Sequence, residues 1–238
     1  MKTFHQHGVY GTSVLTLLTV QNTVSVDQVQ VLDPDYVLAH IDAVVSDIPP
    51  GAAKTGALGS SVVIEAVADL ASDFSFPLVV DPVMISKHGA SLLEHDASEV
   101  LRNRLLPHAF LVTPNLPEAT ALVGFDVTDP PSMERAAVAI GRLGPKNVLI
   151  KGGHLGGRAL DVLWCDGQIH RFECEHIDSK NTHGTGCVYS AAITARVARG
   201  EDLVAAVEAS KNFVTKAIRS SPGLGGGFGP TNLFVSPA

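Results

Sequence analysis

Cysteine is scarce in this chain of 238 residues, which contains only Cys165, Cys174 and Cys187. An odd number of cysteines with no Cys-x-x-Cys pair predicts neither a disulfide framework nor a zinc site. If the Asp-Gly pair at 166–167 closes a two-residue hairpin, Cys174 lies opposite Ala159 and away from Cys165. Reduced thiols, and with them a cytoplasmic location, are therefore expected.

Charged residues are also sparse, and the basic ones are not clustered. Charged residues make up 17% of the chain, the net charge is −7, and no block of lysine or arginine occurs. A nucleic-acid surface needs clustered positive charge, so no nucleic-acid partner is expected. The apolar share of 45% predicts a compact globular protein and not a disordered one. A phosphate-bearing small molecule remains compatible, since a few N–H groups and one lysine suffice to bind it.

Long apolar runs and several well-known catalytic motifs are missing as well. No run approaches the roughly 18 residues of a membrane span, so no membrane partner is expected. Lys2 precedes an apolar stretch, but "HQHGVYG" interrupts it without a cleavage site, which argues against a signal peptide. The chain has no Gly-x-x-x-x-Gly-Lys-Ser/Thr, no Gly-x-Gly-x-x-Gly after its first apolar run, and no Gly-x-Ser-x-Gly. These absences argue against a P-loop nucleotidase, a dinucleotide dehydrogenase and an α/β-hydrolase.

What the chain does contain is a series of short apolar runs that alternate with helical patterns. Runs ended by Pro, Gly or Asp predict buried strands at 12–20, 76–82, 109–114 and 147–153. Apolar residues three and four apart predict helices at 33–47, 60–73, 97–108 and 131–144. Ser61 and Ser132 are candidate caps for two of these helices.

The last third of the chain predicts a hairpin followed by two helices. Two alternating segments at 159–175 flank the Asp-Gly turn. Helices are expected at 186–199 and 201–219, separated by Gly200. The glycine-rich tail at 220–232 is interpreted either as a loop beside a ligand or as a flexible end.

Alternating strands and helices predict an α/β protein in which a mostly parallel sheet lies between two layers of helices. We expect one domain over residues 1–238, with a small β-hairpin in addition. In such sheets, ligands bind beyond the carboxyl ends of the strands. Candidate site residues are therefore sought where the predicted strands end.

A glycine-punctuated turn of Gly184, Thr185 and Gly186 leads into a helix with Cys187 at its start. Successive N–H groups at the positive end of a helix dipole form an anion site, and glycine lets the backbone approach a phosphate closely. A helix N-terminus also lowers a thiol pKa, so Cys187 is a candidate proton acceptor for an alcohol. The structural alternative is an ordinary tight turn with a small buried cysteine.

Asn115 and Glu118 follow a predicted strand and stand one helical turn apart. That spacing places both side chains on one face of a helix start. A carboxylate with an amide neighbour suits a Mg²⁺–water shell beside nucleotide phosphates. A capping box, in which each side chain accepts the other residue's N–H, explains the pair as well and is favoured by the pair alone.

Three further candidates lie at strand ends. Lys151, before two glycines, is either a phosphate ligand or a surface lysine whose ammonium reaches solvent. Asp81, before a proline, is either a site carboxylate or the start of a turn. Gln21 and Asn22 could read a heteroaromatic ring by paired donors and acceptors, although a polar turn is the favoured interpretation.

The order of these motifs is more specific than any one of them. The chain resembles the hydroxymethylpyrimidine/phosphomethylpyrimidine kinases of thiamine biosynthesis, of the ribokinase-like superfamily, in six stretches: "KTFHQHGVYGTSVLTLLTVQNT", "AAKTGALGS", "VVDPVMISKHG", "LLPHAFLVTPNLPEATAL", "VLIKGGHL" and "KNTHGTGCVYSAAITA". The resemblance covers nearly the whole chain. It implies a ribokinase-like three-layer α/β/α fold and a homodimer. It also implies transfer of the γ-phosphoryl group of Mg·ATP to hydroxymethylpyrimidine and then to its monophosphate.

The resemblance also assigns roles to the candidate residues. Residues 184–187 would form an anion hole, with Cys187 beside the accepting oxygen as candidate base. Asn115 and Glu118 would hold Mg²⁺ through water, and Lys151 would contact the ATP phosphates.

The substrate pocket is assigned to Gln21, Ala57 and Asp81. Gln21 matches the position that reads the pyrimidine ring and that tends to differ in pyridoxal kinases. Ala57 departs from the family, because methionine is frequent there against the substrate ring.

A second departure concerns the start of the chain. The family opens with a strand, a Gly/Ser-rich loop and an aspartate ahead of the segment that begins here at Met1. A start misplaced at an internal methionine is the favoured explanation, and a degraded or repurposed copy is the other. Two alternative functions stay open: a pyridoxal or pyridoxine kinase, and a non-catalytic protein that retains a nucleotide or pyrimidine pocket.

Overall fold

The computed structural model describes residues 1–84, 89, 92–93, 97–153 and 158–237. Residues 85–88 of the motif stretch "VVDPVMISKHG" and residues 154–155 of "VLIKGGHL" lie outside these residues. Within them, no helix combines the length and the hydrophobicity that crossing a membrane requires.

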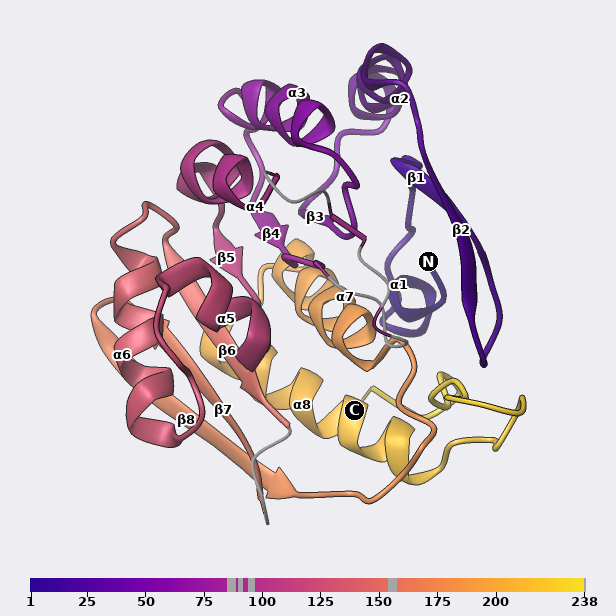
Figure 1. Cartoon of the computed structure of the whole chain (residues 1–238), viewed down its shortest axis with the longest axis vertical. Coiled ribbons are helices and arrows are strands. Elements are labelled where there is room, and N and C mark those ends of the chain that lie inside the picture. The colour runs from indigo at the N-terminus through magenta and orange to yellow at the C-terminus, as the bar shows by residue number, and fades with distance from the viewer. Residues whose placement is uncertain (85–88, 90–91, 94–96, 154–157, 238) are drawn as a thin grey trace.

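A six-stranded sheet with the strand order β3-β4-β5-β6-β7-β8 forms the centre of the molecule (Figure 1). The strands are β3 (Ala53–Thr55), β4 (Leu78–Val80), β5 (Leu111–Val112), β6 (Asn147–Gly152), β7 (Arg158–Cys165) and β8 (Gln168–Glu175). The pairings from β3 to β6 are parallel, whereas β7 and β8 join as antiparallel strands. The predicted mostly parallel sheet and three of its four predicted strands are confirmed.

Helices cover both faces of this sheet (Figure 1). They are α1 (Lys2–Gln6), α2 (Pro34–Asp47), α3 (Ser61–Ala71), α4 (Ala97–Val100), α5 (Leu116–Val123), α6 (Pro130–Gly141), α7 (Thr185–Ala198) and α8 (Leu203–Arg219). Helices α2 to α6 pack on one face, and α7 and α8 pack on the other. The three-layer α/β/α architecture is confirmed.

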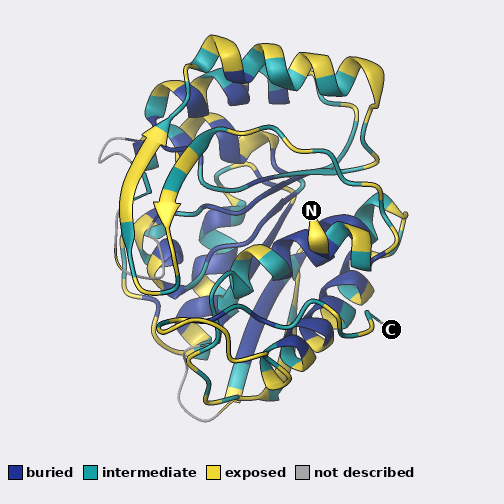
Figure 2. Cartoon of the chain, turned by 90° about the vertical axis from the view of Figure 1, so that its right-hand side faces the viewer, coloured by how far each residue is buried: buried dark blue, intermediate teal, exposed yellow. Residues whose placement is uncertain are grey.

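The central strands supply both cores at once, because successive side chains point to opposite faces. Val80 and Ile150 belong to the core under α2 to α6, whereas their neighbours Val79 and Leu149 belong to the core under α7 and α8. All four are fully buried. Figure 2 shows these strands as a buried layer between the helices.

The predicted hairpin is confirmed as β7 and β8. Asp166 and Gly167 both have left-handed backbone angles, with φ of 50° and 75°, which a two-residue hairpin turn of this twist requires. Cys174 lies opposite Ala159, as expected. The hairpin continues the main sheet through β6 instead of standing apart from it.

Two details of the predicted helices are corrected. The segment at 97–108 is not one α-helix: α4 is followed by a π-helix over Leu101–Leu105 and a 3-10 turn over Leu106–His108. Pro107 lacks an N–H group and so cannot continue an α-helix. The predicted caps are also shifted, since Ser60 caps α3 and Asp129 caps α6 with Ser132 as its capping-box partner.

The predicted buried strand at 12–20 is wrong. Its second half forms β1 (Leu17–Gln21), which pairs antiparallel with β2 (Val26–Val31) in a separate two-stranded sheet. A short turn joins these strands, and the Asn22 side chain accepts the N–H groups of Val24 and Ser25 within it. Such a short turn permits only antiparallel pairing, so this segment cannot join the parallel sheet. Most of the β1–β2 ribbon is exposed (Figure 2).

The glycine-rich tail packs against two other segments. The N–H of Phe228 donates to the carbonyl of Thr23 at 2.8 Å, in the turn of the β1–β2 ribbon. The N–H of His183 donates to the carbonyl of Gly229 at 3.0 Å. The tail therefore connects the ribbon with the segment directly before α7.

Candidate active site

The carboxyl ends of three parallel strands meet at one edge of the sheet. β4 runs into Asp81, β5 runs into Thr113, and Lys151 lies near the end of β6. The backbone N–H of Lys151 donates to the carbonyl of Pro114 at 2.8 Å, so the ends of β5 and β6 are side by side. This edge is where ligands bind in sheets of this kind.

Asp81 is the centre of this edge. Its carboxylate is 2% exposed and accepts from Lys151 Nζ at 2.9 Å, Thr113 Oγ1 at 3.0 Å and Ser190 Oγ at 3.0 Å. Burial alone would raise the pKa of this carboxyl group, but the positive charges of Lys151 and Lys54 and the hydrogen bonds lower it below its ordinary value. Asp81 is therefore ionised and held by protein groups. This arrangement favours a positioning role, and the substrate contact stays a prediction.

Lys151 lies between two carboxyl groups. Burial lowers the pKa of its ammonium, but the charges of Asp81 and Glu118 outweigh that effect, so the pKa is raised overall. The side chain is 13% exposed. A charged, oriented ammonium with little solvent around it is suited to binding phosphate oxygens.

The start of α7 reaches the same place. Gly184 precedes the helix with φ of 74°, in the left-handed region that favours glycine. The hydroxyl of Thr185 donates to the carbonyl of Thr182 at 2.8 Å and closes the turn. A Cβ atom on Gly186 would lie 3.3 Å from Lys151 Nζ. The first turn of α7, whose N–H groups have no acceptor inside the helix, thus stands beside the Lys151 ammonium.

Cys187 lies in this first turn, and the residue is exposed by its accessible surface. The protein packed around its thiol nevertheless desolvates the sulfur, which raises the pKa of the thiol, and the negative charge of Asp81 raises it further. The nearby lysines, Lys54 and Lys151, lower it by less. The direction is opposite to the lowered thiol pKa expected from the helix terminus, because Asp81 and burial oppose the helix dipole.

Asn115 and Glu118 form the predicted capping box. The N–H of Glu118 donates to Asn115 Oδ1 at 2.9 Å, and the N–H of Asn115 donates to Glu118 Oε2 at 2.8 Å. Glu118 is also buried, and burial raises its pKa to about 7 even though the charge of Lys151 opposes the shift. The structural interpretation of the pair is confirmed, and the Mg²⁺ contact stays a prediction.

The structure connects the other substrate candidates less directly. The carbonyl of Ala57 accepts from Thr16 Oγ1 at 2.7 Å, which ties the segment after β3 to the start of the ribbon. Gln21 is exposed at the end of β1, at an irregularity in the strand pairing. Within the described residues, the Gln21 side chain forms no hydrogen bond with the Asp81 cluster, and the methyl group of Ala57 cannot form one. Both substrate contacts stay predictions.

Sequence reasoning missed Ser190 and Lys54, and it placed Thr113 at the end of a predicted strand without giving it a role. Ser190 follows Cys187 by one helical turn, and this i,i+3 spacing was the available signal for a second polar residue on that face of α7. Its hydroxyl also reaches the carbonyl of Cys187 at 3.2 Å. Lys54 lies on β3, a strand of three residues that is too short for a hydrophobic pattern to reveal.

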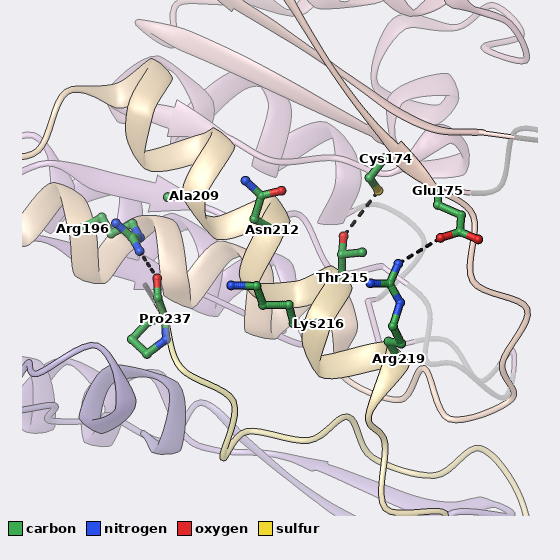
Figure 3. A pocket seen from close by; sticks show the side chains of 9 residues that line it. All are labelled: Cys174, Glu175, Arg196, Ala209, Asn212, Thr215, Lys216, Arg219 and Pro237. Atoms are coloured by element: carbon green, nitrogen blue, oxygen red, sulfur yellow. Dashed lines mark hydrogen bonds and ion pairs between the residues drawn. The ribbon is translucent and has the colours of Figure 1, made fainter.

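A hollow of about 610 Å³ lies elsewhere, along the outer surface of α8 (Figure 3). Two of its cations already have partners: Arg219 pairs with Glu175 at 3.0 Å, and Arg196 pairs with Glu201 at 2.8 Å. No residue predicted for the site lines this hollow. It is separate from the Asp81 cluster.

The three-layer fold, with charged groups gathered at the strand ends beside a glycine turn, places the chain among the ribokinase-like α/β proteins. Solved structures agree: pyridoxal kinase of Bacillus subtilis in an ADP complex has a TM-score of 0.88 at 36% identity, covering 97% of this chain and 88% of that chain. Phosphomethylpyrimidine kinase of Clostridium difficile has a TM-score of 0.81 at 40% identity, covering 91% of this chain and 90% of that one.

Sequence comparison defines the family. The phosphomethylpyrimidine kinase family matches residues 1–232, and the chain belongs to this family. The hydroxymethylpyrimidine/phosphomethylpyrimidine kinase of Synechococcus elongatus is 44% identical, over 98% of this chain and 90% of its own length. A thiamine biosynthesis bifunctional protein of Geobacter sulfurreducens is 46% identical over 99% of this chain, which spans 49% of that longer protein.

Proposed function

We propose that this protein is a phosphotransferase of thiamine biosynthesis. It transfers the γ-phosphoryl group of ATP to the hydroxymethyl group of hydroxymethylpyrimidine, and then to the resulting monophosphate. The observation that carries the proposal is the Asp81 cluster, in which one buried carboxylate fixes Lys151 and, through Ser190, the first turn of α7. The names of the relatives support the same activity.

The reaction requires little beyond positioning and neutralisation of charge. The alcohol oxygen forms a bond to the γ-phosphorus, the bond to the bridging oxygen of ADP breaks, and the alcohol proton leaves. Phosphoryl transfer of this kind makes small demands on a base. Of the proposed anion hole at 184–187, the N–H of Thr185 already donates to the carbonyl of Thr182 at 3.2 Å, so the N–H groups of Gly184, Gly186 and Cys187 bind the oxygens of the transferring group. The Lys151 ammonium balances their negative charge.

Cys187 acts in this scheme as a neutral thiol. Because burial and Asp81 raise the pKa of its side chain, the thiol keeps its proton near neutral pH. It therefore contributes to the wall of the anion hole beside the accepting oxygen. A late transfer of the alcohol proton to solvent or to a phosphate oxygen is sufficient.

The Glu118 side of the site fits a magnesium ion. Burial raises the pKa of this carboxyl group to about 7, and a neighbouring cation would favour its ionised form. No group of three metal-ligating side chains occurs in the part of the chain that the structure describes. The residues present therefore suit a Mg²⁺ ion that is held mainly by phosphates and water, with Glu118 and Asn115 as its protein contacts. Bound Mg²⁺ supplies charge neutralisation on the phosphates.

The purified chain should be assayed with Mg·ATP and three separate acceptors: hydroxymethylpyrimidine, its monophosphate, and pyridoxal. Turnover with both pyrimidines supports the proposal. Turnover with pyridoxal alone would make the chain a pyridoxal kinase, an alternative that the similarity to the Bacillus subtilis enzyme motivates. Tight nucleotide binding without any turnover would contradict an enzymatic function and favour a binding protein.

We also propose that the chain forms a homodimer in the cytoplasm. Leu18 and Val20 are 48% and 57% exposed on the outer face of the β1–β2 ribbon, and a second copy would cover them. Three free cysteines support the reducing compartment. Recovery of the protein from the periplasmic fraction after cell fractionation would contradict this location.

A further inference from the structure

Lys54 is a second cation at the edge of the sheet that holds Asp81. β3 and β4 are parallel, with Thr55 opposite Val80, the residue before Asp81. Nζ of Lys54 lies 3.8 Å from the position that a Cβ on Gly56 would take. Gly56 is two residues further along, on the same side of the extended chain, so the ammonium reaches toward the carboxyl end of the strand.

The charges around Lys54 locate it at the candidate active site. Its positive charge lowers the pKa of Asp81 and opposes the rise in the pKa of Cys187. Helix α7, which carries Cys187, packs against β3. Lys54 therefore lies near both Asp81 and Cys187, the residue in the first turn of α7.

Lys54 differs from Lys151 in having no close partner. Lys151 is bound to Asp81 at 2.9 Å, whereas Lys54 forms no hydrogen bond or ion pair with any residue in the described ranges. Its side chain is half-buried. A half-buried ammonium has lost part of its hydration, and a bound anion would compensate for that loss.

We propose that Lys54 determines specificity for the phosphorylated acceptor by binding its phosphate group. The inference rests on the proposed two-step function. The alcohol is uncharged, whereas a monophosphate brings about −1.5 to −2 charges next to the phosphates of ATP. Lys151 is already committed to Asp81 and the donor phosphates, so of the two described lysines that act on Asp81, Lys54 is the one available to offset the added repulsion.

The second transfer is chemically balanced without a base. An oxygen of the acceptor monophosphate forms a bond to the γ-phosphorus, the bond from that phosphorus to the bridging oxygen breaks, and ADP leaves with the electron pair. A dianionic acceptor has no proton to lose. What this step needs, and the first does not, is positive charge around the attacking phosphate.

The test compares kcat/KM for the two acceptors in wild type, Lys54→Met, Lys54→Arg and the surface control Lys146→Met. Lys54→Met is expected to lower kcat/KM for the monophosphate by about 10- to 100-fold more than kcat/KM for the alcohol, the usual range for a lost charged hydrogen bond. Lys54→Arg should restore the monophosphate reaction, and Lys146→Met should change neither. A general structural role would instead lower both reactions together.

Equal losses for both acceptors, or no loss for either, would overturn the role of Lys54. Thermal melting confirms that each variant is folded, and Lys54→Gln replaces the methionine variant if that one is not. Wild type that phosphorylates neither acceptor would instead refute the proposed function itself. The two failures are therefore distinguishable within one experiment.

Discussion

Among single residues, Asp81 connects more of the candidate active site than any other described side chain. One buried carboxylate receives Lys151 from β6, Thr113 from β5 and Ser190 from α7. Loss of its charge would leave Lys151 with a desolvated ammonium and release the first turn of α7. Stability and positioning therefore depend on the same group.

Asp81→Asn should destabilise the fold by about 3–5 kcal/mol, as expected when one partner of a buried ion pair is removed. It should also lower kcat by at least about 100-fold, because Lys151 and α7 lose their alignment. Urea unfolding and steady-state kinetics measure the two effects. Glu201→Gln is the control, since Glu201 pairs with the largely buried Arg196 at 2.8 Å and neither residue bonds to a member of the Asp81 cluster. If both variants lose activity equally, Asp81 has no special positioning role.

The thiol of Cys187 should react slowly at neutral pH. A raised pKa leaves a smaller thiolate fraction than in an ordinary cysteine, and only the thiolate is alkylated. The rate of iodoacetamide labelling, followed by mass spectrometry, should therefore still rise with pH beyond about 8.5, where an ordinary thiol is half ionised. Cys165, which is buried and has a pKa raised to about 11, should stay unlabelled longest. A rate for Cys187 that levels off below pH 8 would contradict the raised pKa.

Among single residues, sequence reasoning found site residues that stand at the ends of strands or at the starts of helices. Lys151, Asp81 and Glu118 stand at such positions, and the structure brings them together. Lys54 and Ser190 lie inside elements, where a lysine or serine has no local signal. Their relation to the site depends on which strands and helices become neighbours, and that information is not local.

At the scale of elements, the start of α7 depends on backbone conformation. Gly184 and Gly200 stand before and after this helix with nearly the same left-handed φ, 74° and 79°, and a Cβ on either would meet nothing within 4 Å. The two glycines thus share one backbone constraint, but only Gly184 adjoins the Asp81 cluster.

Gly184→Ala and Gly200→Ala should therefore each destabilise the fold by about 1–2 kcal/mol, the cost of a left-handed backbone for alanine. Only Gly184→Ala should also lower kcat, by about 100-fold, because it displaces the N–H groups that bind the transferring phosphoryl group. Chemical unfolding and kinetics on both variants give the comparison. Equal kinetics for both variants would show that the turn is structural only.

The β1–β2 ribbon was the element that the sequence predicted least well. The run at 12–20 has the apolar content of a buried strand, yet the ribbon leaves Leu18 and Val20 exposed. Hydrophobicity marks a residue that will be covered, but it does not say whether the same chain or a second copy covers it.

Val20→Lys should shift the proposed dimer to monomer in size-exclusion chromatography with light scattering. The added charge would be buried against the second copy without a partner. Val62→Lys is the control, because Val62 on α3 is 56% exposed, nearly as much as Val20 at 57%. A wild-type monomer, or equal dissociation by both variants, would refute the ribbon as the dimer surface.

For the whole molecule, alternation along the central strands joins the two cores. Val79 and Val80 enter different cores from adjacent positions, as do Leu149 and Ile150. Neither core can lose its strand residues without disturbing the other. This pattern is readable from the sequence as continuous apolar runs, which explains why β4, β5 and β6 were predicted correctly.

A single cooperative unfolding transition is therefore expected for residues 1–238. Trp164, the one tryptophan, lies on β7 against the core under α2 to α6, so its fluorescence reports on that core. Far-ultraviolet circular dichroism reports on all helices. Fluorescence and dichroism should give the same urea midpoint. Two separated transitions would show that the chain consists of more than one folding unit.

Catalysis of phosphoryl transfer from ATP to a pyrimidine alcohol is the role proposed for the Asp81 cluster. The most direct test of this role is the transfer of a γ-labelled phosphate to hydroxymethylpyrimidine by wild type, Lys151→Met and Lys146→Met under identical conditions. Labelled monophosphate is expected with wild type and Lys146→Met, and at least about 100-fold less with Lys151→Met. Equal labelling by Lys151→Met, or no labelled product with wild type, would contradict this role.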